Sequence, residues 1–441
     1  MALTDTVPFF SGADGQNRKV TLKKLKEALG VQSASINVTT CAGAAVVCTD
    51  GETTLNGVGS TKFSLPENTG TWEVTATLNG HTASAVVEVT GAMQYNVDLV
   101  ITSSVAVTHA PTKTSYFTGE TFNSAGMVVT ATMADGSKKT VTGYTCRPTT
   151  MAANTTAVTV SYSEGGVTKT TTTPVTVTSI SNTLASNSWA TIRAVSDAGK
   201  GSNYWSVGDA KGITINGKVG ATTISNLAIS VFILGFNHNA SREGNNRIHF
   251  QIGKINGTLV GLVDGNYGNY TSTTGAFTMN TSNTNSGGWN NSHMRKTVLG
   301  SNSTSATSPA ANTLLAALPA DLRAVMKPAT KYSDNTGGGS DTASYVTSTT
   351  DLLPLLSEFE YHGARTYANS AEKNYQAQYD YYKAGNSKVH YKHNATGTAA
   401  NAWCRSVSAA YTTAFCRVDT NGSASTSNAS YSWAVAPGFA A

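Results

Sequence analysis

The chain has 441 residues, a formal net charge of +5 and only 12% charged residues, about half the share of an ordinary soluble domain. The hydrophobic share of 39% is sufficient for folded cores, so disorder driven by charge is excluded. The few Lys and Arg residues are scattered, which argues against nucleic acid as a partner, and no apolar run reaches the roughly 18 residues that a membrane insertion needs. At roughly 150 residues per domain, the length predicts about three domains.

The first predicted segment, 1–33, differs in composition from the rest. Thr21 can cap a short helix whose Leu22, Leu25 and Leu29 fall on one face. Two helical turns cannot fold alone, so this segment must dock on a neighbouring domain or a partner. Charged residues stand where a signal peptide needs an apolar stretch, which predicts synthesis in a bacterial cytoplasm without a secretory leader.

Residues 34–97 predict a small β-sandwich. Five short segments alternate apolar and polar residues and are separated by Gly, Asn and Asp turns; they are INVTT, AAVVCT, KFSLP, TWEVTATL and ASAVVEVT. Five strands in this space form two packed sheets. Cys41 and Cys48 can meet across a hairpin, and a disulfide or two free buried thiols are both open alternatives.

A second β-unit is predicted over 98–178. The turn Ala134–Ser137 joins two alternating runs as a hairpin does. Nearly the whole unit resembles the bacterial Ig-like domains of surface and phage proteins. Neither β-unit contains a constellation of residues for chemistry, so both are expected to act as spacers.

The composition changes near residue 180, and 179–441 predict one α+β domain. Its first strands are GITING, NLAISVFILGF and NRIHFQIG, and the nearly continuous apolar run Ile229–Phe236 predicts a central strand. Two helical pieces are predicted over 311–318 and 320–327. A strand with a proline interruption is predicted over 351–363, followed by a helix capped by Ser370 with Tyr375, Tyr379 and Tyr382 on one face. The fold class is therefore mainly β with an α+β C-terminal domain.

No candidate for metal binding or catalysis stands out. His390 and His393 form H-x-x-H, but on a strand this spacing places them on opposite faces. Glu358 and Glu360 share one face of the predicted strand, yet no partner His or nucleophile accompanies them. We therefore expect no enzyme activity, no metal and no cofactor.

Several C-terminal motifs carry a more specific resemblance; they are GGWNNSHMR, LPADLRAVMK, TASYVTSTTDLLPLLSEFEYHG, NYQAQYDYYKAGNSKVHYKHNATGTAANAWCRS and VAPGF. Together they resemble, over about 205–441, the variable proteins of diversity-generating retroelements. That family implies a C-type lectin-like fold related to formylglycine-generating enzymes. The family reads Trp-Trp-Leu-Arg-Ser where this chain has 402–406. Segment 1–33 resembles the N-terminal modules that attach phage tail proteins to the virion.

The stretch 404–432 contains no Lys, Glu, Gln, Met or Trp. In the resembled family, a reverse transcriptase replaces adenines, usually in asparagine codons that end in a pyrimidine. Changes at the first two positions of such codons cannot produce those five residues. Trp433 cannot arise in this way either, so it is fixed or lies outside the diversified set. The resemblance thus implies a variable region at about 402–434.

The resemblance implies that this region binds a ligand while packing elsewhere holds its backbone. Tyr, Ser and Asn are also abundant in antibody loops, where they supply rigid contact area and adaptable hydrogen bonds. The predicted ligand-binding residues are Ala402, Cys404, Val407, Ser408, Ala409, Ala410, Tyr411, Thr412, Thr413, Ala414, Arg417, Asp419, Ser425, Thr426, Ser427, Asn428, Ser430, Tyr431 and Ser432. Phe415, Cys416 and Val418 are expected in the core.

These expectations predict a phage tail receptor-binding protein of the virion. Residues 1–33 would attach it to a tail or baseplate protein, the β-units would form a stalk, and the C-terminal domain would bind a host-surface protein or glycan. Such proteins are commonly homotrimers, which would convert weak contacts into avidity. The alternatives are a bacterial surface adhesin with the same binding domain and, less favoured, an enzyme acting on an envelope polymer.

Overall fold

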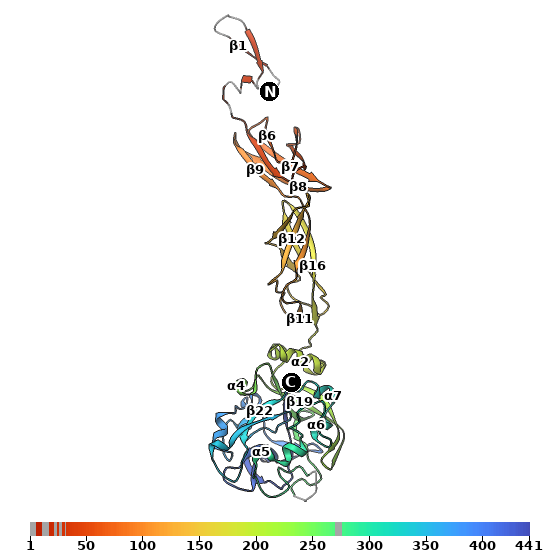
Figure 1. The fold of residues 1–441 in the computed structure, drawn as a ribbon, viewed down its shortest axis with the longest axis vertical. Coiled ribbons are helices and arrows are strands. Elements are labelled where there is room, and N and C mark those ends of the chain that lie inside the picture. Colours follow the sequence, from red (N-terminus) through yellow and green to blue (C-terminus); the bar gives the residue numbers. More distant parts are fainter. Residues whose placement is uncertain (1–5, 11–16, 22–23, 26–28, 31, 270–275) are drawn as a thin grey trace. The chain divides into compact units, whose positions relative to one another are not determined.

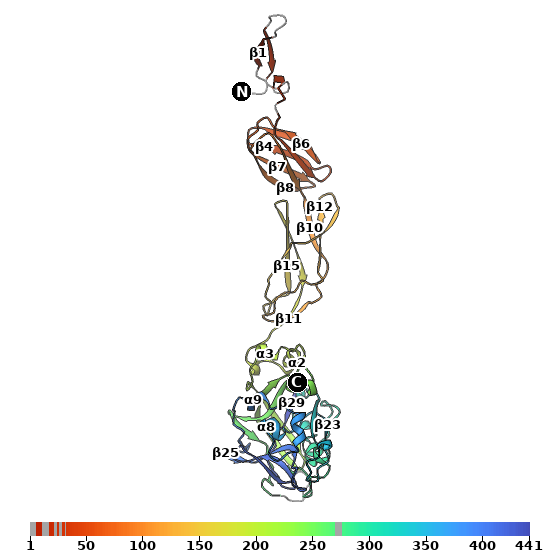
Figure 2. The ribbon, with the colours of Figure 1, turned by 90° about the vertical axis from the view of Figure 1, so that its left-hand side faces the viewer.

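The computed structural model describes residues 6–10, 17–21, 24–25, 29–30, 32–269 and 276–441. It divides into two compact units, Met1–Ser179 and Ile180–Ala441 (Figure 1). The fold is mainly β, as predicted, and the helices in the described ranges are short (Figure 1, Figure 2). None of these helices has the length and apolar character needed to cross a membrane.

The N-terminal segment begins with a hairpin that the sequence did not predict: β1 (Thr6–Phe10) pairs with β2 (Asn17–Thr21). The predicted cap is present, because the Lys24 backbone N–H donates to Thr21 Oγ1 over 3.4 Å. Leu29 is 68% exposed, so the described residues leave most of its side chain uncovered. Leu22 lies outside the described residues.

The first sandwich has one sheet in the order β6-β3-β9 and another in the order β5-β4-β7-β8. Its strands are β3 (Ser35–Thr40), β4 (Ala45–Thr49), β5 (Thr54–Val58), β6 (Thr61–Ser64), β7 (Gly70–Leu78), β8 (His81–Val89) and β9 (Gln94–Leu99). Trp72 packs at the centre of its core. The sequence prediction missed β5, which has no buried residue, and β9, in which only Val97 and Leu99 are buried. The predicted boundary at 97 falls inside β9. Cys41 and Cys48 are free thiols.

The second β-unit has three small sheets, in the orders β10-β12-β13, β11-β17 and β14-β15-β16. Its strands are β10 (Thr102–His109), β11 (Ser115–Phe117), β12 (Val128–Met133), β13 (Lys138–Val141), β14 (Thr145–Arg147), β15 (Ala157–Glu164), β16 (Val167–Pro174) and β17 (Thr176–Thr178). The predicted turn does connect β12 to β13, and the Asp135 carboxylate accepts the Ser137 N–H. Val129 and Val160 are buried in its core.

The main sheet of the C-terminal unit has the order β18-β19-β20-β21-β24-β25, and β29 also pairs with β20. Its strands are β18 (Ala210–Val219), β19 (Thr222–Phe236), β20 (Ile248–Ile255), β21 (Thr258–Gly261), β24 (His390–Lys392), β25 (Ala395–Ala400) and β29 (Gly438–Ala440). The run Ile229–Phe236 lies in β19 between two partner strands, as predicted. Val231, Phe232, Ile233 and Leu234 are fully buried, because both faces of the strand are covered.

Two smaller sheets complete this unit: β22 (Ala329–Asp334) pairs with β23 (Val346–Asp351), and β26 (Ala402–Val407), β27 (Ala414–Val418) and β28 (Ala424–Asn428) form an antiparallel sheet in that order. The short helices are η1 (Leu184–Ser186), α2 (Trp189–Asp197), α3 (Gly201–Tyr204), α4 (Ala240–Glu243), α5 (Gly288–Asn291), η2 (Met294–Val298), α6 (Leu314–Ala317), α7 (Ala320–Arg323), η3 (Ala343–Tyr345), α8 (Glu358–His362), η4 (Ser370–Asn374) and α9 (Asp380–Lys383).

Two local predictions were wrong. Only Asp351 of the strand predicted over 351–363 lies in a strand, β23, and residues 352–357 have no regular structure. Residues 358–362 form helix α8, because Ser357 and Glu360 make a capping box that starts a helix here. The predicted tyrosine-lined helix is split into η4 and α9, and Asn369 rather than Ser370 caps η4. Tyr379 and Tyr382 are nevertheless buried in the core.

Candidate ligand-binding face of the C-terminal unit

The loops at one end of the β26-β27-β28 sheet lie together. The sheet is antiparallel, so the end of β26, the start of β27 and the end of β28 share one edge. The Ala429 N–H donates to the Thr413 carbonyl over 2.7 Å. This contact joins loop 408–413, which follows β26, to loop 429–432, which follows β28.

Predicted ligand-binding residues are exposed on this edge and along β28. Tyr411 is 55% exposed and Tyr431 is 36% exposed. Ala410 and Thr412 are exposed as well. The partly exposed members of the predicted set are Ala409, Thr413, Arg417, Asp419, Ser425, Thr426, Ser427 and Asn428. We call these exposed and partly exposed residues the binding face.

Other predicted ligand-binding residues are buried, and the prediction is corrected for them. They are Ala402, Cys404, Val407, Ser408, Ala414, Ser430 and Ser432. Every residue of β26 is buried, because α8 and β22 contact this strand. Ser432 is fully buried, and its hydroxyl donates to Asp264 over 2.7 Å. Phe415, Cys416 and Val418 are core residues, as expected.

Asn285 holds the backbone of loop 408–413 from outside the loop. Its side-chain Nδ2 donates to the carbonyls of Tyr411 (2.6 Å) and Ala414 (3.0 Å), and its backbone N–H donates to the Thr412 carbonyl over 2.9 Å. Its Oδ1 accepts the Gly338 N–H over 2.8 Å. Asn285 is fully buried, so this clamp does not depend on the identity of the exposed side chains.

One further hydrogen bond holds the same loop, and a glycine approaches the loop backbone closely. The Ala409 N–H donates to the Tyr367 carbonyl over 2.9 Å. Gly339, with a φ of +63°, lies so close to the loop that an added Cβ would be 3.0 Å from the Thr412 nitrogen. A side chain at this position would therefore press on the loop backbone.

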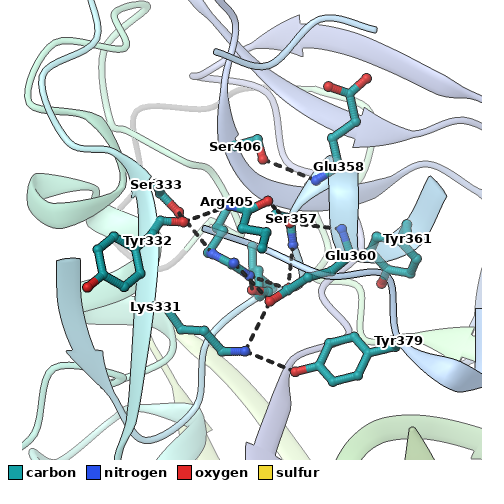
Figure 3. Close-up of polar contacts among 12 residues, drawn as sticks. Lys331, Tyr332, Ser333, Ser357, Glu358, Glu360, Tyr361, Tyr379, Arg405 and Ser406 are labelled. Carbon is teal, nitrogen blue, oxygen red and sulfur yellow. Dashed lines mark hydrogen bonds and ion pairs between the residues drawn. The ribbon is translucent and has the colours of Figure 1, made fainter. Parts of the chain in front are cut away.

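A buried network of charges lies directly behind β26 (Figure 3). Arg405, in β26, donates from both terminal nitrogens to the Glu360 carboxylate. Lys331 Nζ lies 3.0 Å from Glu360 Oε1 and 2.7 Å from Glu243 Oε2, and it donates to the Tyr379 hydroxyl over 3.0 Å. Two cations and two carboxyl groups thus lie together in the interior. Burial raises the pKa of the Glu243 carboxyl, and the Lys331 charge opposes this rise.

The pKa values in this network follow from burial and the neighbouring charges. Burial disfavours ionisation of Glu360, but Arg405 and Lys331 outweigh it and lower the pKa of this carboxyl. Burial also disfavours the charged form of Lys331, but Glu243 and Glu360 outweigh it and raise its pKa. Burial raises the pKa of Glu372 to about 7, although it accepts the Ser406 hydroxyl over 2.7 Å.

One group of potential metal ligands lies in the same network. Ligand atoms of His238, Glu243 and Glu360 lie within 4.8 Å of one another. The Lys331 ammonium already contacts both carboxylates, and a metal ion there would face its positive charge at close range. Burial lowers the pKa of His238 to about 3, so the ring stays neutral. We therefore assign the group to stability rather than to metal binding.

The carboxylates considered for acid–base chemistry are occupied structurally. Glu358 accepts the backbone N–H groups of Thr366, Tyr367 and Ala368, and it is 1% exposed. Glu360 is equally buried. Neither carboxylate can reach a substrate in solvent. The sequence predicted that both lie on one face of a strand, but in helix α8 Glu358 accepts backbone N–H groups and Glu360 pairs with Arg405 and Lys331.

Asn285, Gly339 and Lys331 support the face but were not predicted from the sequence. The only local signal was the run of three glycines at 337–339. Contacts between residues more than 70 positions apart, such as Asn285 with the Tyr411 carbonyl, leave no trace in local spacing.

Two parts of the chain match known families. Residues 109–177 match the bacterial Ig-like domain (group 3), which confirms the Ig-like prediction for the second β-unit. Residues 271–440 match a domain of unknown function, DUF6273, and this match includes the binding face. No curated protein matches the chain.

Proposed function

We propose that this protein binds a ligand on a host cell surface, without catalysis, through the binding face of its C-terminal unit. The observation that carries the proposal is that buried groups hold the backbone of loop 408–413 while the side chains of the loop are exposed. The carbonyls of Tyr411 and Thr412 are held by Asn285, while their side chains point away from the core and are exposed. Side chains on such a loop can change without loss of the fold.

The buried charge network supports the same proposal. Arg405, Glu360 and Lys331 fix β26 immediately before the loop, and each is nearly or fully inaccessible to solvent. A loop that emerges from a rigid strand loses less conformational entropy on binding. The exposed residues include Tyr411 and Tyr431, the residue type that supplies most contact area in antibody loops.

The finer proposal is a phage tail receptor-binding protein with a C-type lectin-like binding domain, diversified by a retroelement. It rests on the resemblance of the C-terminal motifs and on the residue types absent from 404–432. Under this proposal, residues 1–33 bind a tail or baseplate protein, the Ig-like units act as spacers, and the chain assembles as a homotrimer of the virion. A bacterial surface adhesin with the same face is the alternative.

The binding proposal is tested with the fluorescently labelled full chain on a panel of intact bacterial cells. Tyr411→Ala and Tyr431→Ala should each reduce binding about tenfold or more, because exposed aromatic residues dominate binding energy. Melting temperatures should stay nearly unchanged. Val86→Ala, which changes an exposed apolar side chain on β8, serves as the control and should bind normally.

Unchanged binding in both tyrosine variants would refute the binding face. A large loss of melting temperature would instead show that these tyrosines belong to the core. The retroelement proposal has a separate test in the genome. We expect a near-copy of the segment that encodes 402–434 beside a reverse transcriptase gene, differing only at adenine positions; differences spread over all bases would contradict it.

A further inference from the structure

Three aromatic rings meet beside β28 at the border of the binding face. Tyr431 stacks on Trp433 with ring centroids 6.0 Å apart, and Tyr267 meets Trp433 edge-on at 5.2 Å. The Trp433 indole N–H donates to Ser427 Oγ over 2.8 Å, which fixes the ring against β28. All three residues are at least partly exposed among the described residues, so each can contact a ligand.

Two cations lie against these rings without an acidic partner. The Arg417 guanidinium lies 5.7 Å from the Trp433 centroid, and Lys392 Nζ lies 4.1 Å from the Tyr267 centroid. Neither forms an ion pair with any carboxylate in the described part of the chain. Arg417 uses Nε and Nη1 on the Thr426 carbonyl and the Asn401 side chain, and its Nη2 has no hydrogen bond to a described residue.

The nearby carboxylates are committed elsewhere. Asp419 Oδ1 accepts the N–H groups of Asn421 and Ser423 within its own turn. Asp264 is buried and accepts the Phe277 N–H and the Ser432 hydroxyl. Asp419 also attracts the Arg417 guanidinium electrostatically, but neither Arg417 nor Lys392 forms an ion pair with a described carboxylate, so both cations can contact an external anion.

We propose that Tyr267, Tyr431 and Trp433, with Arg417 and Lys392, form a subsite for an acidic pyranose, such as a uronic acid unit of a surface polysaccharide. The C–H groups of a pyranose face carry partial positive charge and pack on the negative face of an aromatic ring. A carboxylate on the sugar pairs with the free guanidinium nitrogen. Ser425 and Ser427 are partly exposed, and their hydroxyls can bond to the sugar hydroxyls.

This inference rests on the proposed function and names its ligand class. It also divides the site into constant and variable parts. Trp433 cannot arise from a diversified asparagine codon, and Tyr267 and Lys392 precede the predicted variable region. Tyr267, Lys392 and Trp433 would thus form the constant part of the subsite. Arg417 and Tyr431 lie inside the predicted variable region, and they would set the preference for an acidic sugar together with Tyr411 and its neighbours.

The experiment uses the full chain on an array of purified bacterial capsular polysaccharides, acidic and neutral. Each polysaccharide that binds is also tested after chemical reduction of its carboxylates to alcohols, which removes the charge and retains the ring. We expect binding to acidic polymers, weakened about tenfold or more by the reduction and by added salt. Trp433→Ala should abolish binding to both forms.

Arg417→Gln should weaken binding to the acidic polymer about tenfold and leave binding to its reduced form unchanged. Arg417→Lys should recover part of the loss, and the melting temperature of each variant excludes unfolding as the cause. Lys254→Gln is the matched control, because Lys254 Nζ also lies over two rings, Phe232 at 4.2 Å and Tyr381 at 4.7 Å, outside this subsite.

Binding confined to neutral polysaccharides, or unaffected by carboxylate reduction, would overturn the inference. It would also be overturned if no polysaccharide bound while binding to intact cells persisted and was lost after protease treatment, since the ligand would then be a protein. Absence of binding to any cell in the panel would contradict the proposed function itself.

Discussion

Strand β26 and the loop that follows it differ sharply in what they can tolerate. In β26, Arg405 is fully buried and bonded to Glu360, Ser333 and a backbone carbonyl. Only six positions later, Tyr411 is 55% exposed and contributes its carbonyl, rather than its side chain, to the fold. Exposed side chains of the loop can therefore change without loss of the fold, because buried residues outside the loop hold its backbone.

The largest loss of stability is expected when the buried charge network next to β26 is broken. Arg405→Ala leaves Glu360 without its bidentate partner in a buried site, and it should lower the free energy of unfolding by about 3–5 kcal/mol. Urea denaturation measures the change. The control is Arg365→Ala, which removes the half-exposed pair with Asp341 and should cost about 1 kcal/mol or less. Equal losses in the two variants would contradict the structural role of the network.

Acid should also lower the free energy of unfolding. His390 is fully buried, and burial lowers its pKa from the ordinary 6.5 to about 4. Between these values the unfolded chain binds a proton at this residue and the folded chain does not, so stability falls as the pH drops from about 6.5 to about 4. At pH 4.5 the loss from His390 is on the order of 2 kcal/mol.

Thermal unfolding between pH 7 and pH 4.5 measures this effect. Glu372 acts in the opposite direction, because its pKa is raised to about 7 in the folded chain. The folded chain binds this proton more tightly than the unfolded chain, so the contribution of Glu372 to the free energy of unfolding rises as the pH falls below about 7. His390→Gln should therefore reduce the acid-induced loss and Glu372→Gln should increase it. Identical pH profiles for the wild type and both variants would show that neither group controls stability here.

A smaller effect on stability and a large one on binding are expected at the clamp. Asn285→Ala leaves the Tyr411 and Ala414 carbonyls without their donor, which should cost about 1–3 kcal/mol. The loop should then lose its fixed shape, and binding to the cells that the wild type recognises should fall. Asn421→Ala, in the exposed turn after β27, is the control and should leave stability and binding unchanged.

The smallest effect on stability is expected on the loop itself. Simultaneous replacement of Ala410, Tyr411 and Thr412 by Asn should change the free energy of unfolding by less than about 1 kcal/mol, because these side chains are exposed. Val407→Asn, a few residues earlier, should destabilise the protein strongly, since it places an amide in a fully buried site. Equal stability of these two variants would contradict the claim that the loop tolerates substitution and β26 does not.

Local patterns predicted much of the fold. Alternation over short segments correctly identified five of the seven strands of the first sandwich, and the apolar run Ile229–Phe236 correctly identified the central strand β19. The same kind of reasoning failed at 358–362, because a capping box between Ser357 and Glu360 outweighed the apolar run before it. Edge strands such as β5 were missed because their exposed side chains follow no strong pattern.

The amino-acid sequence was sufficient to predict the class of fold and the Ig-like unit. It did not determine which residues of 402–434 are exposed, because the neighbouring elements, not the local composition, cover β26 and leave Tyr411 in solvent. Only the tertiary structure brought Asn285, Lys331 and Tyr267 to this face. Their contacts join distant segments, and such contacts form only when the chain is folded.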